Sequence, residues 1–191
     1  MAKIEALIPF LIYFESGVAD SSLDAKSLFE KAKGKGIASD PADAGGATLA
    51  GITIGTYRDY CRRKGLKTPE VADLARLQYA EWLEILKTMF WDRWQADRIE
   101  SQPVAEMLVD WVWTSGRYGI TIPQRLLGVT ADGIVGPATL AALASREPAQ
   151  LFGQIKAARI DYIENICRNR PANLRFRKGW LRRIAAINPP N

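Results

Sequence analysis

The chain has 191 residues, of which 48% are hydrophobic and 25% charged, as is typical of a folded globular protein. This composition excludes a disordered or fibrous protein, and a chain of this length can bury a sizeable core without metals or disulfides. It contains no histidine, which excludes histidine-based triads, zinc hydrolases with histidine ligands and papain-like cysteine sites in their usual forms. We predict no cofactor and no metal. The two cysteines, Cys61 and Cys167, are predicted to be reduced and buried, and a single disulfide between them is the alternative.

The net charge of +5 is unevenly distributed along the chain. Residues 151–191 hold nine Lys and Arg against two Asp and Glu, a net charge of +7, so the remainder carries about −2. A basic end suits an anionic partner, and bacterial cell wall, lipid head groups and nucleic acid all qualify. A solvated basic surface without a partner is an equally good explanation for any single one of these residues.

The first predicted element is a helix that ends near Glu15. Its apolar residues follow a three- and four-residue spacing, namely Ile4, Leu7, Ile8, Leu11 and Ile12. Glu15 continues the same face, and Pro9 predicts that the helix begins near it or is kinked there. The apolar residues 7–14 lack the cleavage site of a signal peptide and are too few to span a bilayer. We therefore expect a core helix and no classical export signal.

The remaining elements are mostly helical. Residues 20–37, polar and rich in lysine and glycine, predict an exposed insertion, and residues 40–46 predict a loop. Residues 47–55 are short, β-branched and interrupted by glycine, which predicts a small hairpin or extended segment. Further helices are predicted to start at Pro69 toward Phe90, at Pro103 through Trp113, at Pro123, at Pro137 through Leu143, and at Pro148 toward Cys167. The fold class is therefore mainly α, with one small β-hairpin or extended segment near residues 47–56.

Two carboxylates have the features of an acid and its ionised partner. Glu15 ends an apolar helical face, where lost hydration and the helix dipole should both raise its pKa. Asp43 follows Asp40 by three residues in a glycine-rich turn and should stay ionised. A protonated Glu with an ionised Asp is the division of labour in glycoside hydrolysis. The alternatives are a surface Glu at a helix end and Asp residues that only stabilise the turn, which we favour for Asp40 and weigh equally for Asp43.

Other conspicuous residues favour structural roles. Asp110 stands in an apolar helix, where an unpaired charge would be costly, so it should have a partner such as an arginine or a backbone amide. A structural ion pair is one role, and support of Glu15 is the alternative. Most tryptophans fall at helical spacing among apolar residues and predict core packing, whereas Tyr57 is a better candidate for a cleft. The tryptophans are Trp82, Trp91, Trp94, Trp111, Trp113 and Trp180.

Several segments in this order resemble glycoside hydrolase family 108, the N-acetylmuramidases that include phage-type endolysins and secretion activator proteins. They are Glu15-Ser-Gly17, residues 40–48 with the pattern D-P-x-D-x-G-G-x-T, Gly51-Ile-Thr53, Phe90-Trp-Asp92, the Pro103 helix with Asp110, and residues 176–183. Residues 124–139 are similar to the Q-x-x-L-G-x-x-x-D-G-x-x-G-P-x-T core of peptidoglycan-binding domains. Val18-Ala19 replaces a glycine-tyrosine of the family, and Thr114-Ser-Gly116 stands where related lysozymes often have asparagine-glycine.

The resemblance implies a lysozyme-like helical fold and a muramidase. Residues 1–100 would form the catalytic region and residues 101–191 a peptidoglycan-binding-like region, packed together as one compact unit. Cleavage would fall on the β-1,4 bond between N-acetylmuramic acid and N-acetylglucosamine. Glu15 would protonate the leaving oxygen, Asp43 would stabilise positive charge or orient water, and Thr48 or Thr53 would hold that water. For either threonine a purely structural role in the β segment is the alternative.

The resemblance also implies the partners. Tyr57, Gly45 and Gly46 are predicted to contact the substrate, and Asp110 to lie behind the catalytic residues. Peptidoglycan is the predicted partner, with no nucleic acid because no recognition-helix signature is present, no stable membrane insertion, and a monomeric state. We expect synthesis in the bacterial cytoplasm and action on the cell wall after release. The competing interpretation is a non-catalytic peptidoglycan-binding or secretion-accessory protein.

Overall fold

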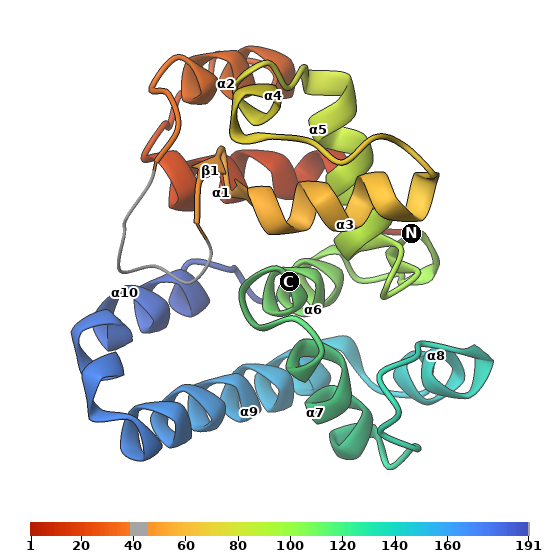
Figure 1. The fold of residues 1–191 in the computed structure, drawn as a ribbon. Coiled ribbons are helices and arrows are strands. Elements are labelled where there is room, and N and C mark those ends of the chain that lie inside the picture. Colours follow the sequence, from red (N-terminus) through yellow and green to blue (C-terminus); the bar gives the residue numbers. More distant parts are fainter. Residues whose placement is uncertain (39–45, 191) are drawn as a thin grey trace. The chain divides into compact units, whose positions relative to one another are not determined.

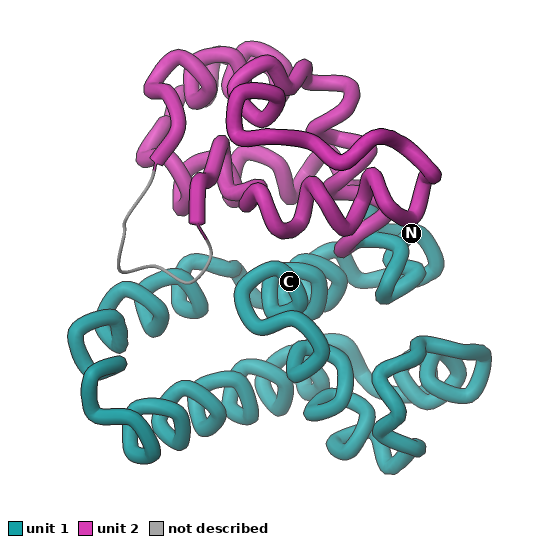
Figure 2. Tube along the Cα trace, in the orientation of Figure 1, with its two compact units in different colours: residues 1–3, 91–191 teal, residues 4–90 magenta. Residues whose placement is uncertain are grey.

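A computed structural model describes residues 1–38 and 46–190. Helices account for 67% of the chain, and the strands described form a single two-stranded antiparallel sheet (Figure 1). The predicted mainly α, lysozyme-like fold is therefore confirmed. The chain divides into two compact units (Figure 2): unit 2 comprises residues 4–90, and unit 1 comprises residues 1–3 and 91–191.

Unit 2 begins with the predicted amphipathic helix. Helix α1 (Ile4–Ser16) buries five apolar residues on one face, Ile4, Leu7, Ile8, Leu11 and Ile12. Pro9 lies inside this helix and points to solvent, so the helix does not begin there. It ends at Gly17, whose φ of +70° suits glycine and whose amide donates to the Tyr13 carbonyl at 2.7 Å. Glu15 is thereby placed in the last turn of a helix anchored by its buried face.

The predicted exposed insertion is wrong, because it contains a packed helix. Helix α2 (Ala25–Lys33) starts at Asp24, whose side chain accepts a hydrogen bond from the Ser27 amide at 2.8 Å. It buries Leu28, Phe29 and Ala32 and packs against α1. Four lysines among residues 26–35 surround this apolar stripe in the sequence and hide its three- and four-residue spacing.

The predicted hairpin is confirmed. Strands β1 (Thr48–Leu49) and β2 (Ile52–Thr53) pair antiparallel, with Thr48 opposite Thr53. Both turn residues have positive φ, 45° at Ala50 and 82° at Gly51, as two-residue hairpin turns of type I′ require. The Ala50 carbonyl accepts a hydrogen bond from the indole of Trp82 at 3.1 Å, which fastens the turn to the core.

The rest of unit 2 differs from the prediction. Helix α3 (Ile54–Lys64), which was not predicted, follows the hairpin directly. The single helix predicted from Pro69 toward Phe90 is instead divided into three pieces, α4 (Val71–Ala75), α5 (Tyr79–Leu86) and a π-helical turn (Lys87–Trp91). Helix α4 starts at Glu70 through a capping box with Asp73. Residues 76–78 interrupt the helix while Leu77 is buried, so the apolar pattern continues where the helical backbone does not.

Unit 1 is a helical assembly around α6 (Gln102–Ser115), which is buried along most of its length. Against it pack α7 (Tyr118–Leu127) and α9 (Pro148–Asn169), and α10 (Leu174–Ala185) packs on α9 (Figure 1). The unit also contains α8 (Pro137–Ala144) and two short 3₁₀ turns, Ala96–Arg98 and Pro171–Asn173. The helices predicted at Pro103, Pro137 and Pro148 are confirmed, whereas Pro123 lies inside α7 instead of starting it.

The predicted burial of the two cysteines and of most tryptophans is also confirmed. Cys61 and Cys167 are free and buried. Four tryptophans have 0% exposure, namely Trp82, Trp91, Trp94 and Trp111. Trp113 and Trp180 are only partly buried, so core packing does not account for every indole.

Candidate functional site

Glu15 lies on backbone that is held in place from several directions. Its neighbour Ser16 donates its hydroxyl to the Ile12 carbonyl at 2.7 Å and accepts from the Val18 amide at 3.2 Å. The Ser16 carbonyl accepts a hydrogen bond from the Lys35 ammonium at 2.6 Å, at the negative end of the α1 dipole. The Glu15 side chain itself is partly exposed. A carboxyl group in this position can reach a ligand in solvent while its main chain stays fixed.

The loop residues predicted to accompany Glu15 are described only in part. Asp40, Asp43 and Gly45 lie outside the described residues, so their predicted roles stay predictions. Gly46 has a φ of +68°, in the left-handed region that favours glycine. Its carbonyl accepts from the Thr48 hydroxyl at 3.4 Å. For Gly46 the structure therefore gives a backbone reason for glycine that is independent of substrate.

The two candidate threonines differ in what their hydroxyls already bind. Thr53 caps α3, because its Oγ1 accepts from the Thr56 amide at 3.1 Å and exchanges a further hydrogen bond with the Thr56 hydroxyl at 3.1 Å. Thr48, its cross-strand partner, is partly buried and makes the long contact to Gly46. The structure thus gives Thr53 a clear structural role and leaves Thr48 as the better candidate to hold water.

Tyr57 is buried, with 7% exposure. Its hydroxyl donates to the Glu81 carboxylate at 2.7 Å, and burial together with this carboxylate raises the pKa of the phenol. It contributes to the wall of an open pocket of about 360 Å³ that Asp73, Arg76 and Glu81 also line. Little of the Tyr57 ring is available for stacking on a sugar, although the pocket beside it is open.

Asp110 has the arginine partner expected from its position. The side chain is fully buried and pairs with Arg159 at 2.7 Å and with Arg183 at 2.7 Å. Burial raises the pKa of Asp110, but the two guanidinium groups more than offset this, and the net effect lowers it. This cluster ties α6 to α9 and α10 inside unit 1. Its predicted support of Glu15 stays a prediction.

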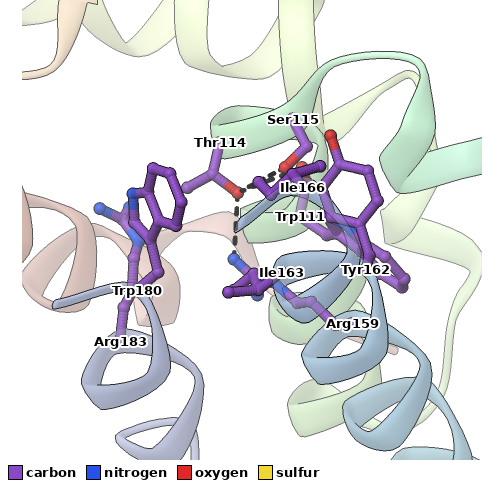
Figure 3. A pocket seen from close by; sticks show the side chains of 9 residues that line it. All are labelled: Trp111, Thr114, Ser115, Arg159, Tyr162, Ile163, Ile166, Trp180 and Arg183. Atoms are coloured by element: carbon purple, nitrogen blue, oxygen red, sulfur yellow. Dashed lines mark hydrogen bonds between the residues drawn. The ribbon is translucent and has the colours of Figure 1, made fainter. Parts of the chain in front are cut away.

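A pocket that the sequence analysis did not predict adjoins this ion cluster (Figure 3). It has a volume of about 110 Å³ and lies between α9, α10 and the end of α6. Its lining residues are Trp111, Thr114, Ser115, Arg159, Tyr162, Ile163, Ile166, Trp180 and Arg183. The sequence feature that could have indicated this pocket is Trp180, because it stands among basic residues near the C-terminus and not within an apolar run.

The motif at residues 124–139 builds a loop. Gln124 is fully buried, and its amide nitrogen donates to Asp132 Oδ1 and to the Ile134 carbonyl, both at 3.0 Å. Its amide oxygen accepts from the Gly133 backbone amide at 2.9 Å. Gly133 has a φ of +79°, a backbone conformation that favours glycine, and it lies against the Arg117 side chain. These residues stabilise the connection between α7 and α8.

Within residues 1–38 and 46–190, no group of three or more Cys, Asp or Glu side chains is arranged to hold a metal ion. Over the same residues, no helix combines the length and the apolar character needed to cross a bilayer.

Two known families match the chain. Residues 31–116 match Glycosyl hydrolase 108, and residues 118–185 match the Predicted Peptidoglycan domain. Asp43, Thr48, Tyr57 and Asp110 fall within the first match, whereas Glu15 precedes it. The pocket between α9 and α10 draws six of its nine lining residues from the second match.

One similar solved structure is described as the "Structure of Brucella abortus SagA". It is 25% identical, the similarity covers 85% of this chain and 92% of that chain, and the TM-score is 0.68. No curated protein matches the chain. The two family matches and this likeness confirm that the chain resembles glycoside hydrolase family 108 followed by a C-terminal peptidoglycan domain.

Proposed function

We propose that this protein is an N-acetylmuramidase that hydrolyses the glycan strands of peptidoglycan, with Glu15 as its general acid. The observation that carries the proposal is the order of the two matches, a Glycosyl hydrolase 108 region at residues 31–116 followed at once by a Predicted Peptidoglycan domain at residues 118–185. The first region is similar to a family of glycosidases, and the second is similar to a domain named for peptidoglycan. Together they favour the glycan of the cell wall as the substrate.

The position of Glu15 supports its role. It lies in the last turn of α1, whose opposite end and buried face are fixed in the core of unit 2. The backbone around it is held by Ser16 and Lys35. A general acid must keep a defined position relative to the leaving oxygen, because proton transfer needs hydrogen-bond distance. Glu15 combines this fixed backbone with a partly exposed side chain.

The reaction follows from these groups. Glu15 donates its proton to the glycosidic oxygen as the bond to the muramic acid C1 breaks, and the positive charge that develops on the sugar is stabilised by Asp43. Water adds to C1, with the Thr48 hydroxyl as the group that orients it, and the proton that this water loses returns Glu15 to its protonated form, directly or through solvent. The net result is one new reducing end for each water consumed. Peptide bonds of the wall are unchanged.

The test is digestion of purified peptidoglycan, with reducing ends and released peptides measured separately. The wild-type protein should generate new reducing ends at muramic acid, and Glu15→Gln should lower the rate by about 10²- to 10⁴-fold, the usual contribution of a general acid. Glu5→Gln is the matched control, since Glu5 lies on the same helix and is exposed at its other end. This control should retain wild-type activity.

Two outcomes would contradict the proposal. If the wild-type protein sediments with the wall and releases no reducing ends, the protein is a binding or accessory protein and not a hydrolase. If Glu15→Gln and Glu5→Gln are equally active, another residue is the acid. Circular dichroism of both variants should show unchanged helix content, so that loss of activity is not loss of fold.

A further inference from the structure

The pocket beside the Asp110 cluster has aromatic side chains on two opposite sides (Figure 3). Trp180, from α10, forms one side, and Tyr162, from α9, forms the other. Both are only partly buried, so part of each ring faces the open space between the helices. Flat apolar surfaces on two sides of a narrow space suit a flat ligand of ring size.

Each of these rings is held by other aromatic side chains. The Tyr162 ring lies 6.1 Å from that of Trp111 and 5.4 Å from that of Tyr118, measured between centroids. The Trp180 ring lies 5.6 Å from that of Phe176. Aromatic pairs at these centroid distances attract one another, which favours the positions that the two rings have in the structure.

The end of the pocket near α6 is polar. Thr114 Oγ1 accepts from Arg159 Nη2 at 3.1 Å and lies 3.5 Å from the Ser115 hydroxyl (Figure 3). Arg159 is also bound to Asp110 at 2.7 Å, so the guanidinium is fixed. Thr114 is exposed, but its hydroxyl already donates to the Asp110 carbonyl at 3.0 Å, so toward a ligand it can act only as an acceptor. The partly exposed Ser115 adds a second hydroxyl at this end of the pocket.

The combination of aromatic sides and a polar end matches the surface of a pyranose sugar. A pyranose ring has a face of C–H groups, which carry partial positive charge and pack on the negative face of an aromatic ring. Its rim carries hydroxyl and amide groups that need hydrogen-bond partners. The pocket offers the same two kinds of contact, and its volume of about 110 Å³ limits the ligand to one ring or part of one.

We propose that this pocket binds one N-acetylhexosamine ring of the peptidoglycan glycan, with its C–H face on Trp180 and its polar rim toward Thr114 and Ser115. The inference rests on the proposed function for the identity of the glycan. Six of the nine lining residues belong to the Predicted Peptidoglycan domain match. The exposed Arg175 and Lys178 on α10 add positive charge, which attracts the carboxylates of wall peptides.

The test measures affinity in the Glu15→Gln background, so that hydrolysis does not consume the ligand. Trp180→Ala should weaken binding to purified peptidoglycan, and to the soluble trimer of N-acetylglucosamine, by about tenfold, which corresponds to about 1.4 kcal/mol. Trp180→Phe keeps an aromatic face and should recover most of the affinity. Leu174→Ala is the matched control, because Leu174 is an exposed apolar residue of α10 that does not line the pocket.

The results separate this inference from the proposed function. If Trp180→Ala binds as tightly as Leu174→Ala, with thermal unfolding showing both folded, the pocket is not a sugar site and the inference is overturned. If binding depends on Trp180 while the wild-type protein releases no reducing ends, the muramidase proposal fails and the binding site stands. If Trp180→Phe is as weak as Trp180→Ala, an aromatic face is not what the ligand recognises, and the inference is again overturned.

Discussion

Asp110 is the residue on which the packing of unit 1 depends most directly. It is fully buried, and its two carboxylate oxygens are bound by Arg159 and Arg183 from different helices. Removing one member of a buried ion cluster leaves a charge without compensation and usually costs more than the cluster contributes when intact. Removal of the Asp110 carboxylate should therefore lower the free energy of unfolding by a large amount, and the size of this effect should depend on pH.

Asp110→Asn is predicted to lower the free energy of unfolding by about 3–5 kcal/mol at neutral pH, measured by urea denaturation. Because the pKa of Asp110 is lowered in the folded state, its ionised form stabilises the fold above about pH 4. This contribution declines as the pH falls from there through the lowered pKa. The difference between wild type and variant should therefore shrink in acid. Glu164→Gln, which breaks the part-exposed pair with Arg177, should have little effect at any pH.

Thr53 and Thr48 allow a structural role to be separated from a functional one. Thr53→Ala removes the N-cap of α3 and should cost about 1 kcal/mol of unfolding free energy, while Thr53→Ser should retain it. Thr48→Ala should cost less, because among residues 1–38 and 46–190 its hydroxyl makes one long hydrogen bond, to the Gly46 carbonyl at 3.4 Å. The same variant should lower hydrolysis if Thr48 orients water. If Thr53→Ala and Thr48→Ala have equal thermal stability, or equal activity, then the two threonines do not differ in role as predicted.

At the scale of elements, α2 is the clearest departure from the pattern of the sequence. Helix α2 buries three residues and packs against α1, and the ring centroid of its Phe29 lies 5.4 Å from that of Trp82. Helix α2 also precedes Lys35, which binds the carbonyl at the end of α1 beside Glu15. The segment that looked like an insertion thus supports the helix that carries the proposed acid.

Phe29→Ala should therefore destabilise the protein by about 3–5 kcal/mol, as expected for a large buried ring. Lys26→Ala, on the exposed side of the same helix, should change the unfolding free energy by less than about 0.5 kcal/mol. Urea denaturation of both variants checks this. A Phe29→Ala protein as stable as wild type would mean that α2 is not part of the core.

At the scale of the molecule, positive charge is concentrated in the last helices. Residues 151–191 carry a net charge of +7, and this stretch includes most of α9, all of α10 and six of the nine residues that line the pocket between them. Long-range attraction between such a surface and an anionic wall is screened by salt, with a Debye length of about 10 Å at 0.1 M. Charge should therefore affect affinity for the wall more than the chemistry of cleavage.

Sedimentation of the Glu15→Gln protein with purified peptidoglycan should accordingly weaken as sodium chloride rises from about 0.05 to 0.5 M. Binding to chitin, a neutral polymer of N-acetylglucosamine, should change much less and serves as the control. Binding to peptidoglycan that is independent of salt would assign the basic residues to a solvated surface with no part in recognition.

The family resemblance, the mainly α class, the first helix with Glu15 near its end and the hairpin could all be predicted from the sequence. The helices near Pro103, Pro137 and Pro148 could be predicted in the same way. These features depend on local signals, because helical periodicity, capping prolines and turn glycines act over a few residues. Two features could not be predicted, namely the interruption of the helix expected after Pro69 and the helix among the lysines of residues 25–33. Both depend on which side chains are buried, and local composition does not indicate burial.

Which polar side chains meet depends on how the helices pack, and the sequence alone could not show it. Asp110 and Arg183 are 73 residues apart in the chain, and no periodic pattern links them. Trp180 and Tyr162 become opposite sides of one pocket only because α9 and α10 fold back on each other beside the end of α6 (Figure 3). The sequence could supply the aromatic and charged residues, but their juxtaposition arises from helix packing, which depends on contacts between segments far apart in the chain.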